Sequence, residues 1–287
     1  MSGPAPYTLT EPREATSAVV FSSPHSGRIY PEDLIARARL DRRALRASED
    51  AFVDRLFASA PDWGAPLIAA TMPRAYVDLN RGPEELDPAV VRDVQATGLN
   101  PRVAAGLGVI PRIVAEGRPI YRGKIALEEA RARIAAWHTP YHQKLEALMT
   151  EAAGRFGHAL LLDCHSMPTD ALRAAPRVRG GRAEIVLGDR FGASAARPFM
   201  LEAAAAFEGA GFAVAMNAPF AGGHITQRYG RPAQGWHAIQ IEIDRGLYLD
   251  QERVEPGPGF DAFHATLARV IPLLAGMGRA PRALAAE

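Results

Sequence analysis

Two histidines stand at the ends of apolar segments that are typical of buried strands. His25 lies in the run Phe21-Ser-Ser-Pro-His25-Ser-Gly27, and His165 follows Leu160-Leu-Leu-Asp163-Cys. Because ligands of open α/β sheets bind outside the carboxyl ends of the strands, both imidazoles can reach one point. Neutral imidazole is a preferred zinc ligand, and one carboxylate completes a site with an open position. The pair therefore indicates a metal site; the alternative is that each histidine only caps or packs.

Acidic side chains interrupt another apolar strand. Isoleucine alternates with polar residues over Ile239-Gln240-Ile241-Glu242-Ile243-Asp244. A period of two puts the polar side chains on one face of a strand and the isoleucines on the other. A buried carboxylate is costly unless it is paired or has a chemical role. Glu242 is therefore a candidate for catalysis, with a structural salt bridge to an arginine as the alternative.

Four segments together resemble the N-formylglutamate amidohydrolase family, from about residue 17 to residue 250. They are Ser23-Pro-His25-Ser-Gly27-Arg28, Arg74-x-x-x-Asp78-x-Asn80-Arg81, Asp163-Cys-His165-Ser166 and Gln240-Ile-Glu242. The arginine, Asn-Arg and glutamate positions are also similar, more distantly, to those of the zinc carboxypeptidases, aspartoacylase and succinylglutamate desuccinylase. Members of that wider group cleave amide bonds next to a carboxylate. The segments are specific as a set and in this order, although each alone is weak.

The resemblance implies zinc held by His25, His165 and a carboxylate. In the distant relatives that carboxylate lies three residues after the first histidine, where this chain has Arg28, which cannot bind a metal. The segment that begins at Ser48 offers Glu49 and Asp50 instead, and the resemblance favours Asp50. Ser48 can also cap a helix whose first turn would favour both acidic residues whatever their function. Two imidazoles and one carboxylate suit catalytic zinc better than magnesium or calcium.

The remaining roles also follow from the resemblance. Glu242 would act as general base, and Arg74 would stabilise the oxyanion of a tetrahedral intermediate. Asn80 and Arg81 would bind a substrate carboxylate, since a planar guanidinium can hold it through two hydrogen bonds. The implied reaction is hydrolysis of an N-formyl amino acid, with N-formyl-L-glutamate preferred, to L-glutamate and formate in histidine degradation.

Three other histidines lie near these segments. His224 follows Gly222-Gly223 in a loop that resembles a family segment near the substrate, so it could contact the ligand; an exposed loop histidine is nearly as good an interpretation. His138 and His142 have the i,i+4 spacing that can bind zinc on a helix. No glutamate follows His138, however, and packing is the favoured interpretation.

Two other functions fit the same residues. One is a related hydrolase that removes a different acyl group, as in aspartoacylase-like or carboxypeptidase-like enzymes. The other is a non-catalytic protein that has kept only the arginine grip on a carboxylate. Glu242 together with three candidate metal ligands argues against the second. The substrate side chain beyond the formyl amide, the metal used in the cell and the oligomeric state are left open.

Alternating strand and helix patterns predict the fold. We expect strands at Ala18–Ser22, Pro66–Thr71, Ala75–Leu79, His158–Asp163, Ala183–Gly188, Ala213–Asn217 and Ala238–Ile243. One helix is expected from about Leu127 to Phe156, with a kink or break near His138 because of Pro140, and another from Ala193 or Ser194 to Gly209 or Gly211. The pattern indicates a three-layer α/β/α fold with a mostly parallel, mixed central sheet. The resemblance makes that fold zinc-carboxypeptidase-like. Residues 82–123 are rich in proline and glycine. We interpret them as an excursion over the active face within a single domain of residues 1–287.

Composition agrees with a soluble enzyme of one domain, and the resemblance implies a small-molecule substrate that carries a carboxylate. The chain has 287 residues, of which 48% are apolar, so it can bury a large core. With 33 basic and 32 acidic residues, no nucleic acid partner is implied. Cys164 is the single cysteine, which predicts a small buried residue and a cytoplasmic location. No apolar run reaches the length of a membrane span, and the first residues do not resemble a secretory signal.

Overall fold

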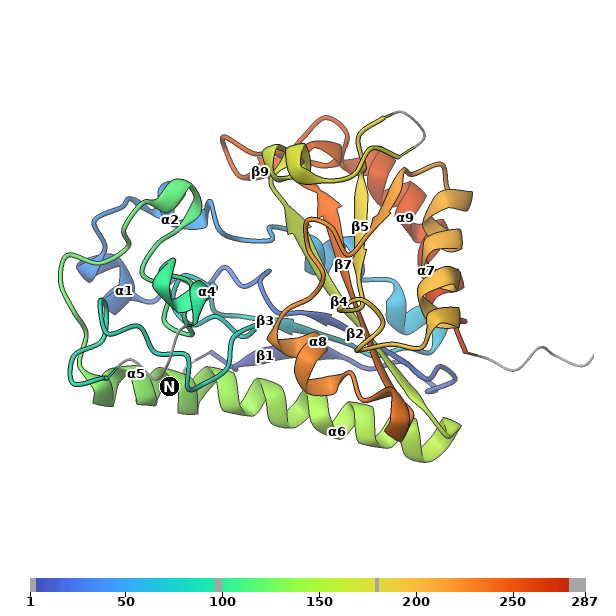
Figure 1. Cartoon of the computed structure of the whole chain (residues 1–287), viewed down its shortest axis with the longest axis horizontal. Coiled ribbons are helices and arrows are strands. Elements are labelled where there is room, and N and C mark those ends of the chain that lie inside the picture. The colour runs from blue at the N-terminus through green and yellow to red at the C-terminus, as the bar shows by residue number, and fades with distance from the viewer. Residues whose placement is uncertain (1–3, 96–99, 179–180, 279–287) are drawn as a thin grey trace, which may run out of the picture.

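The centre of the molecule is a seven-stranded sheet with the order β1-β3-β2-β4-β7-β5-β6 (Figure 1). It is seen in a computed structural model that describes residues 4–95, 100–178 and 181–278. The strands are β1 (Tyr7–Thr10), β2 (Val19–Ser23), β3 (Leu67–Ala70), β4 (Ala159–Met167), β5 (Ile185–Gly188), β6 (Val214–Met216) and β7 (Trp236–Asp244). Neighbours pair in parallel except β1 with β3 and β5 with β7, which are antiparallel. The predicted mostly parallel, mixed sheet is confirmed.

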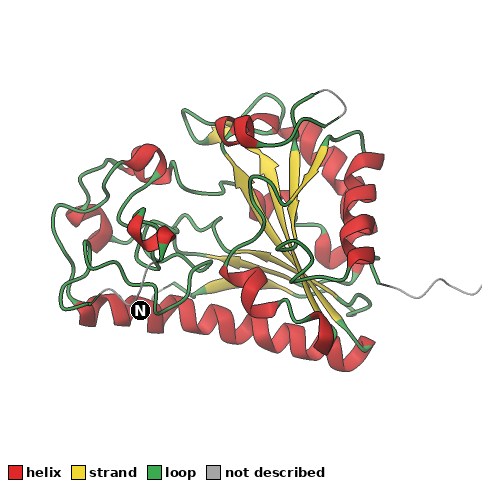
Figure 2. Cartoon of the chain, in the orientation of Figure 1, coloured by secondary structure: helices red, strands yellow, loops and turns green. Residues whose placement is uncertain are grey.

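Helices cover both faces of this sheet (Figures 1 and 2). Leu160 and Leu162 of β4 pack in the cluster that contains Phe207 of α7 (Arg197–Gly209) and Leu267 of α9 (Phe260–Ala275). Leu161, between them, packs in the cluster that contains Leu145 of α6 (Thr139–Phe156). Because consecutive residues of a strand point to opposite faces, β4 is buried on both sides. The architecture is therefore the three-layer one expected.

The smaller helices are α1 (Glu32–Arg37), α2 (Arg42–Arg46), α3 (Val53–Leu56), α4 (Pro101–Ala104), α5 (Leu127–Arg133) and α8 (His224–Tyr229), and β8 (Leu249–Asp250) pairs with β9 (Glu255–Pro256). Among these elements, the helices labelled α1, α2 and α4 in Figure 1 lie beside the sheet, in a part of the molecule that Figure 2 shows as largely loop. No helix among the described residues is long and apolar enough to cross a membrane.

Register along β4 and β7 determines which side chains meet. The parallel pairing puts His165 directly beside Glu242, and β2 pairs Ser22 with Asp163. Ile241, between the polar residues of β7, is fully buried in the core, as is Cys164 of β4. The expected alternation in β7 and the burial of the cysteine are thus confirmed, and one face of both strands is left for polar groups at the carboxyl edge.

The expected strand Ala75–Leu79 is wrong. The segment consists of turns and irregular backbone, although Ala75, Val77 and Leu79 are buried as a strand would bury them. Asp78 N–H donates to the carbonyl oxygen of Val109, a residue of the segment 82–123, and not to a neighbouring strand of the sheet. Apolar periodicity recognised the burial of the segment but could not distinguish a strand from a buried loop.

Two expected helix boundaries also differ. Ser48 does not cap a helix: its hydroxyl donates to the carbonyl oxygen of Leu45, and α3 begins only at Val53. The second expected helix, α7, starts at Arg197, a few residues later than predicted.

Around Pro140 the long helix changes its hydrogen-bond register without ending. A π-helical turn, Ile134–His138, joins α5 directly to α6. Proline has no N–H to continue the regular ladder, and a π-turn is one way in which a helix absorbs such a gap. The predicted disturbance near His138 is present as this turn.

Candidate metal centre and substrate pocket

His25, Asp50 and His165 converge in one buried cluster. His25 follows β2, Asp50 lies in the loop before α3 and His165 is near the carboxyl end of β4, and none is more than 3% exposed. Asp50 Oδ2 lies 2.9 Å from His165 Nδ1 and 3.3 Å from His25 Nδ1. One nitrogen or oxygen of each residue lies within 4.8 Å of the others, so the three can hold a metal ion.

The outer nitrogen of each imidazole faces a second carboxylate. His25 Nε2 is 2.7 Å from Asp78 Oδ1, and His165 Nε2 is 2.9 Å from Asp163 Oδ2. Metal-binding histidines commonly donate this N–H to a carboxylate, which directs the other nitrogen to the metal. His25 Nδ1 is buried and makes no hydrogen bond. This arrangement fits a metal ion between His25, His165 and Asp50.

The carboxylates around His165 favour a proton on its ring. Burial acts to lower the pKa of His165, but the carboxylates of Asp163 and Asp50 outweigh burial and raise the pKa well above its usual value. A metal ion would have to displace that proton. Its binding is therefore expected to release protons and to weaken at low pH.

Arg245 determines which oxygen of Asp50 faces the histidines. Its Nη2 donates to Asp50 Oδ1 over 2.9 Å, which leaves Oδ2 toward the imidazoles. Glu49 has other partners: the hydroxyl of Tyr30 donates to it over 2.5 Å and Arg46 Nε over 3.2 Å. The structure thus groups Asp50, and not Glu49, with the histidines.

Glu242 stands beside this cluster with its carboxylate held by Gln240, whose Nε2 donates to Oε1 over 2.8 Å. Burial raises the pKa of Glu242 to about 7, with His165 acting to lower it and Asp50 to raise it. A carboxylate with a pKa near neutrality suits general acid-base work. Within the residues that the structure describes, Glu242 makes no ion pair with an arginine, so the salt-bridge interpretation lacks a partner.

Asp78 links His25 to Arg74. Arg74 Nη2 donates to Asp78 Oδ2 over 2.8 Å, while Oδ1 of the same carboxylate contacts His25. Asp78 therefore orients both groups, and Arg74 reaches the pocket partly exposed.

Asn80 and Arg81 also reach the pocket, but Asn80 is engaged by the protein. Its Oδ1 accepts the backbone N–H of Ile225 over 2.8 Å, and its Nδ2 lies 3.4 Å from Asp163 Oδ2. Arg81 donates from Nε to the carbonyl oxygen of Leu107 over 2.7 Å. Asn80 therefore lines the cavity and also connects neighbouring segments of the site through its hydrogen bonds.

A cavity of about 490 Å³ opens onto these residues. Its wall includes six groups already described, namely His25, Asp50, Arg74, Arg81, His165 and Glu242. The segment 82–123 forms another part of the wall through Arg102, Leu107 and Ile113. Arg102 was missed by sequence reasoning, because nothing in its local sequence distinguishes it from other exposed arginines.

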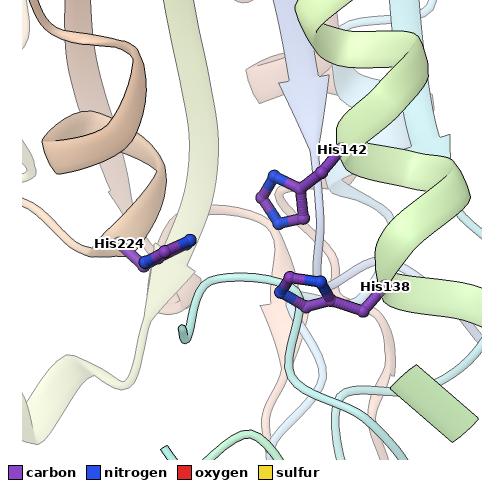
Figure 3. A group of neighbouring side chains, drawn as sticks. All are labelled: His138, His142 and His224. Carbon is purple, nitrogen blue, oxygen red and sulfur yellow. The ribbon is translucent and has the colours of Figure 1, made fainter. Parts of the chain in front are cut away.

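His224 is not among the residues that line the cavity, unlike Gly222 and Gly223 before it. Its ring turns instead toward His138 and His142 (Figure 3). The expectation that His224 contacts the substrate is therefore not supported by its position. A Cβ on Gly223 would lie 2.5 Å from the Asn80 amide, so it is the glycine that lets this loop close on the site.

The chain is similar in sequence and in structure to known proteins. The profile of the N-formylglutamate amidohydrolase family matches residues 17–249. An N-formylglutamate deformylase of Pseudomonas aeruginosa is 33% identical over 239 residues, which are 82% of this chain and 83% of that protein; one of Pseudomonas putida is 27% identical, with 81% and 82% covered. The crystal structure of N-formylglutamate amidohydrolase from Ralstonia eutropha JMP134 superposes with a TM-score of 0.87 at 34% identity, covering 95% of this chain and 98% of that one.

Proposed function

The chain belongs to the N-formylglutamate amidohydrolase family, and we propose that it hydrolyses N-formyl-L-glutamate to L-glutamate and formate, with zinc held by His25, Asp50 and His165. The observation that carries the proposal is the unpartnered, buried Nδ1 of His25. It faces Asp50 and His165 in a cavity that also contains a candidate base. The activity of the named relatives supplies the reaction.

Zinc in this position would polarise the formyl carbonyl and lower the pKa of a water molecule toward neutrality. Glu242 would accept a proton from the attacking water and later deliver it to the leaving amine. Arg74, held by Asp78, would stabilise the negative charge that develops on the formyl oxygen. Gln240 would keep the carboxylate of Glu242 directed at the cavity.

Two arginines of the cavity wall favour a substrate with two carboxylates. Arg81 donates to the carbonyl oxygens of Leu107 and Asn80, and Arg102 to that of Gly222. Among the described residues neither arginine makes an ion pair, in contrast to Arg74 and Arg245. We assign Arg81 to the α-carboxylate and Arg102 to the side-chain carboxylate of N-formyl-L-glutamate.

Replacement of Arg102 by glutamine tests this assignment. We expect kcat/KM for N-formyl-L-glutamate to fall about 10-fold to 100-fold, because a charge-assisted hydrogen bond contributes about 1.5–3 kcal/mol. For N-formyl-L-methionine, which has no side-chain carboxylate, kcat/KM should change little. Arg122→Gln is the matched control, since Arg122 is an exposed arginine of the same segment that does not line the cavity.

Formate release on both substrates is the measurement. An equal loss on the two substrates would mean that Arg102 does not read the side chain. Turnover of acetyl or succinyl amides above that of formyl amides would favour the related acylases, and binding without turnover would favour the non-catalytic alternative. The place of the reaction in histidine degradation and the cytoplasmic location remain predictions from the sequence.

A further inference from the structure

Three imidazoles form a second cluster outside the cavity. His138 ends the π-helical turn, His142 lies in the first turns of α6 and His224 begins α8 (Figure 3). The ring centroids of His138 and His142 are 4.2 Å apart, and those of His142 and His224 are 5.5 Å apart. Nitrogens of the three lie within 4.8 Å of one another, so proximity alone would permit a metal ion.

Hydrogen bonds indicate a different role for two of these rings. His138 Nε2 is 2.9 Å from the carbonyl oxygen of Arg81, and His142 Nε2 is 2.8 Å from that of Leu79. A carbonyl oxygen only accepts, so both Nε2 atoms must carry the proton. The hydroxyl of Tyr229 lies 3.0 Å from the other nitrogen of His142, Nδ1, and 3.0 Å from the carbonyl oxygen of His142, and its single proton can be donated to only one of them. With its N–H directed at Leu79, His142 has a lone pair only on Nδ1, against which the Tyr229 hydroxyl lies.

Burial keeps the two rings neutral. It lowers the pKa of His138 to about 4, and burial together with the neighbouring His138 lowers the pKa of His142 well below its usual value. A neutral imidazole has a single N–H. In each ring that one proton is directed at a backbone carbonyl of the segment Leu79–Arg81.

This segment needs such partners because it belongs to no strand. The two carbonyl groups flank Asn80, and a buried carbonyl without a donor would cost about 1–3 kcal/mol. On the amide side Asn80 N–H donates to Asp78 Oδ1 over 2.8 Å. The backbone around Asn80 is thus fixed by side chains rather than by a sheet.

We infer that His138 and His142 are positioning residues that hold the backbone on both sides of Asn80, so that Arg81 presents its guanidinium to the substrate carboxylate. The inference rests on the proposed function, because it assigns that carboxylate to Arg81. Loss of either donor would let the segment move, and a displaced Arg81 would bind the substrate less well.

A pair of substitutions at His138 separates this role from simple packing. His138→Leu removes the donor, whereas His138→Gln retains an amide N–H at a similar reach. We expect the leucine variant to raise KM for N-formyl-L-glutamate about 10-fold with little change in kcat, and the glutamine variant to restore most of the lost affinity. KM for the α-amide of the same substrate, which lacks the carboxylate, should be equal in all three proteins.

Hydrogen exchange gives a readout that does not need turnover. Measured by mass spectrometry, the peptide that covers residues 78–82 should exchange about tenfold faster in His138→Leu than in wild type, and at the wild-type rate in His138→Gln. If the leucine variant does not fold, His142→Leu and His142→Gln take its place.

Three results would overturn the inference: an unchanged KM and exchange rate in a folded leucine variant, a glutamine variant as impaired as leucine, or a second zinc per chain that is lost with His138. Failure of the proposed function would look different. Wild type itself would then release no formate, while hydrogen exchange would still decide whether the histidines hold the segment.

Discussion

In each histidine of this region, the ring nitrogen that carries the proton determines what the side chain can do. His25 and His165 each face a carboxylate with Nε2, and this leaves Nδ1 directed at Asp50 and at the position proposed for the metal ion. His138 and His142 each face a carbonyl with Nε2, and this organises backbone instead. The same residue type therefore serves two purposes, and the partner of the outer nitrogen determines which.

The substitution Glu242→Gln tests whether Glu242 is the general base. The substitution preserves shape and the contact with Gln240 but cannot accept a proton. We expect kcat to fall by on the order of 100-fold or more, with zinc content and KM close to those of wild type. Steady-state formate release together with metal analysis of the same preparation is the measurement. Near-normal kcat with zinc in place would reduce Glu242 to a structural residue.

At the scale of elements, the parallel pairing of strands brings the candidate metal-binding and catalytic residues together. β2, β4 and β7 pair in parallel, so residues distant in the sequence meet at one edge of the sheet. The period of two in β7 was enough to predict the face of Glu242. The conformation of Ala75–Leu79 could not be predicted, because its backbone depends on partners such as Val109 and His142 that no local pattern reveals.

The π-helical turn and α6 supply a pH-dependent contribution to stability through His138. Its pKa is about 4 in the folded chain against an ordinary 6.5, so the unfolded chain takes up the proton at higher pH. The contribution is complete above pH 6.5 and is lost as pH falls toward 4, by up to about 3 kcal/mol.

His138→Gln should remove this part of the dependence. The free energy of unfolding, measured by denaturant titration of metal-free protein between pH 7.5 and pH 4.5, should fall less steeply for the variant than for wild type. His142 contributes with the same sign in both proteins, and its part also weakens in the variant because His138 no longer acts to lower the pKa of His142. Parallel curves would show that His138 is not held neutral by the fold.

At the scale of the whole molecule, the sheet and its helices were predictable from the sequence, whereas the segments that line the cavity were less so. The three layers, the mixed sheet and the grouping of His25, Asp50 and His165 followed from strand-end residues and from the family resemblance. Arg102 and the orientation of His224 did not, because both depend on how the segment 82–123 and the loop before α8 fold over the sheet. Those segments are held by side-chain contacts over long sequence separations, such as that of Arg102 with the carbonyl oxygen of Gly222.

Zinc titration of metal-free protein, with bound zinc and formate release recorded on the same samples, tests the central claim most directly. We expect release from N-formyl-L-glutamate to rise from near zero to a plateau at about one zinc per chain. Asp50→Ala should lose both zinc and activity, whereas Glu49→Ala, if folded, should keep the zinc. Full formate release by the metal-free protein, or undiminished zinc in Asp50→Ala, would contradict a metal-dependent hydrolase centred on His25, Asp50 and His165.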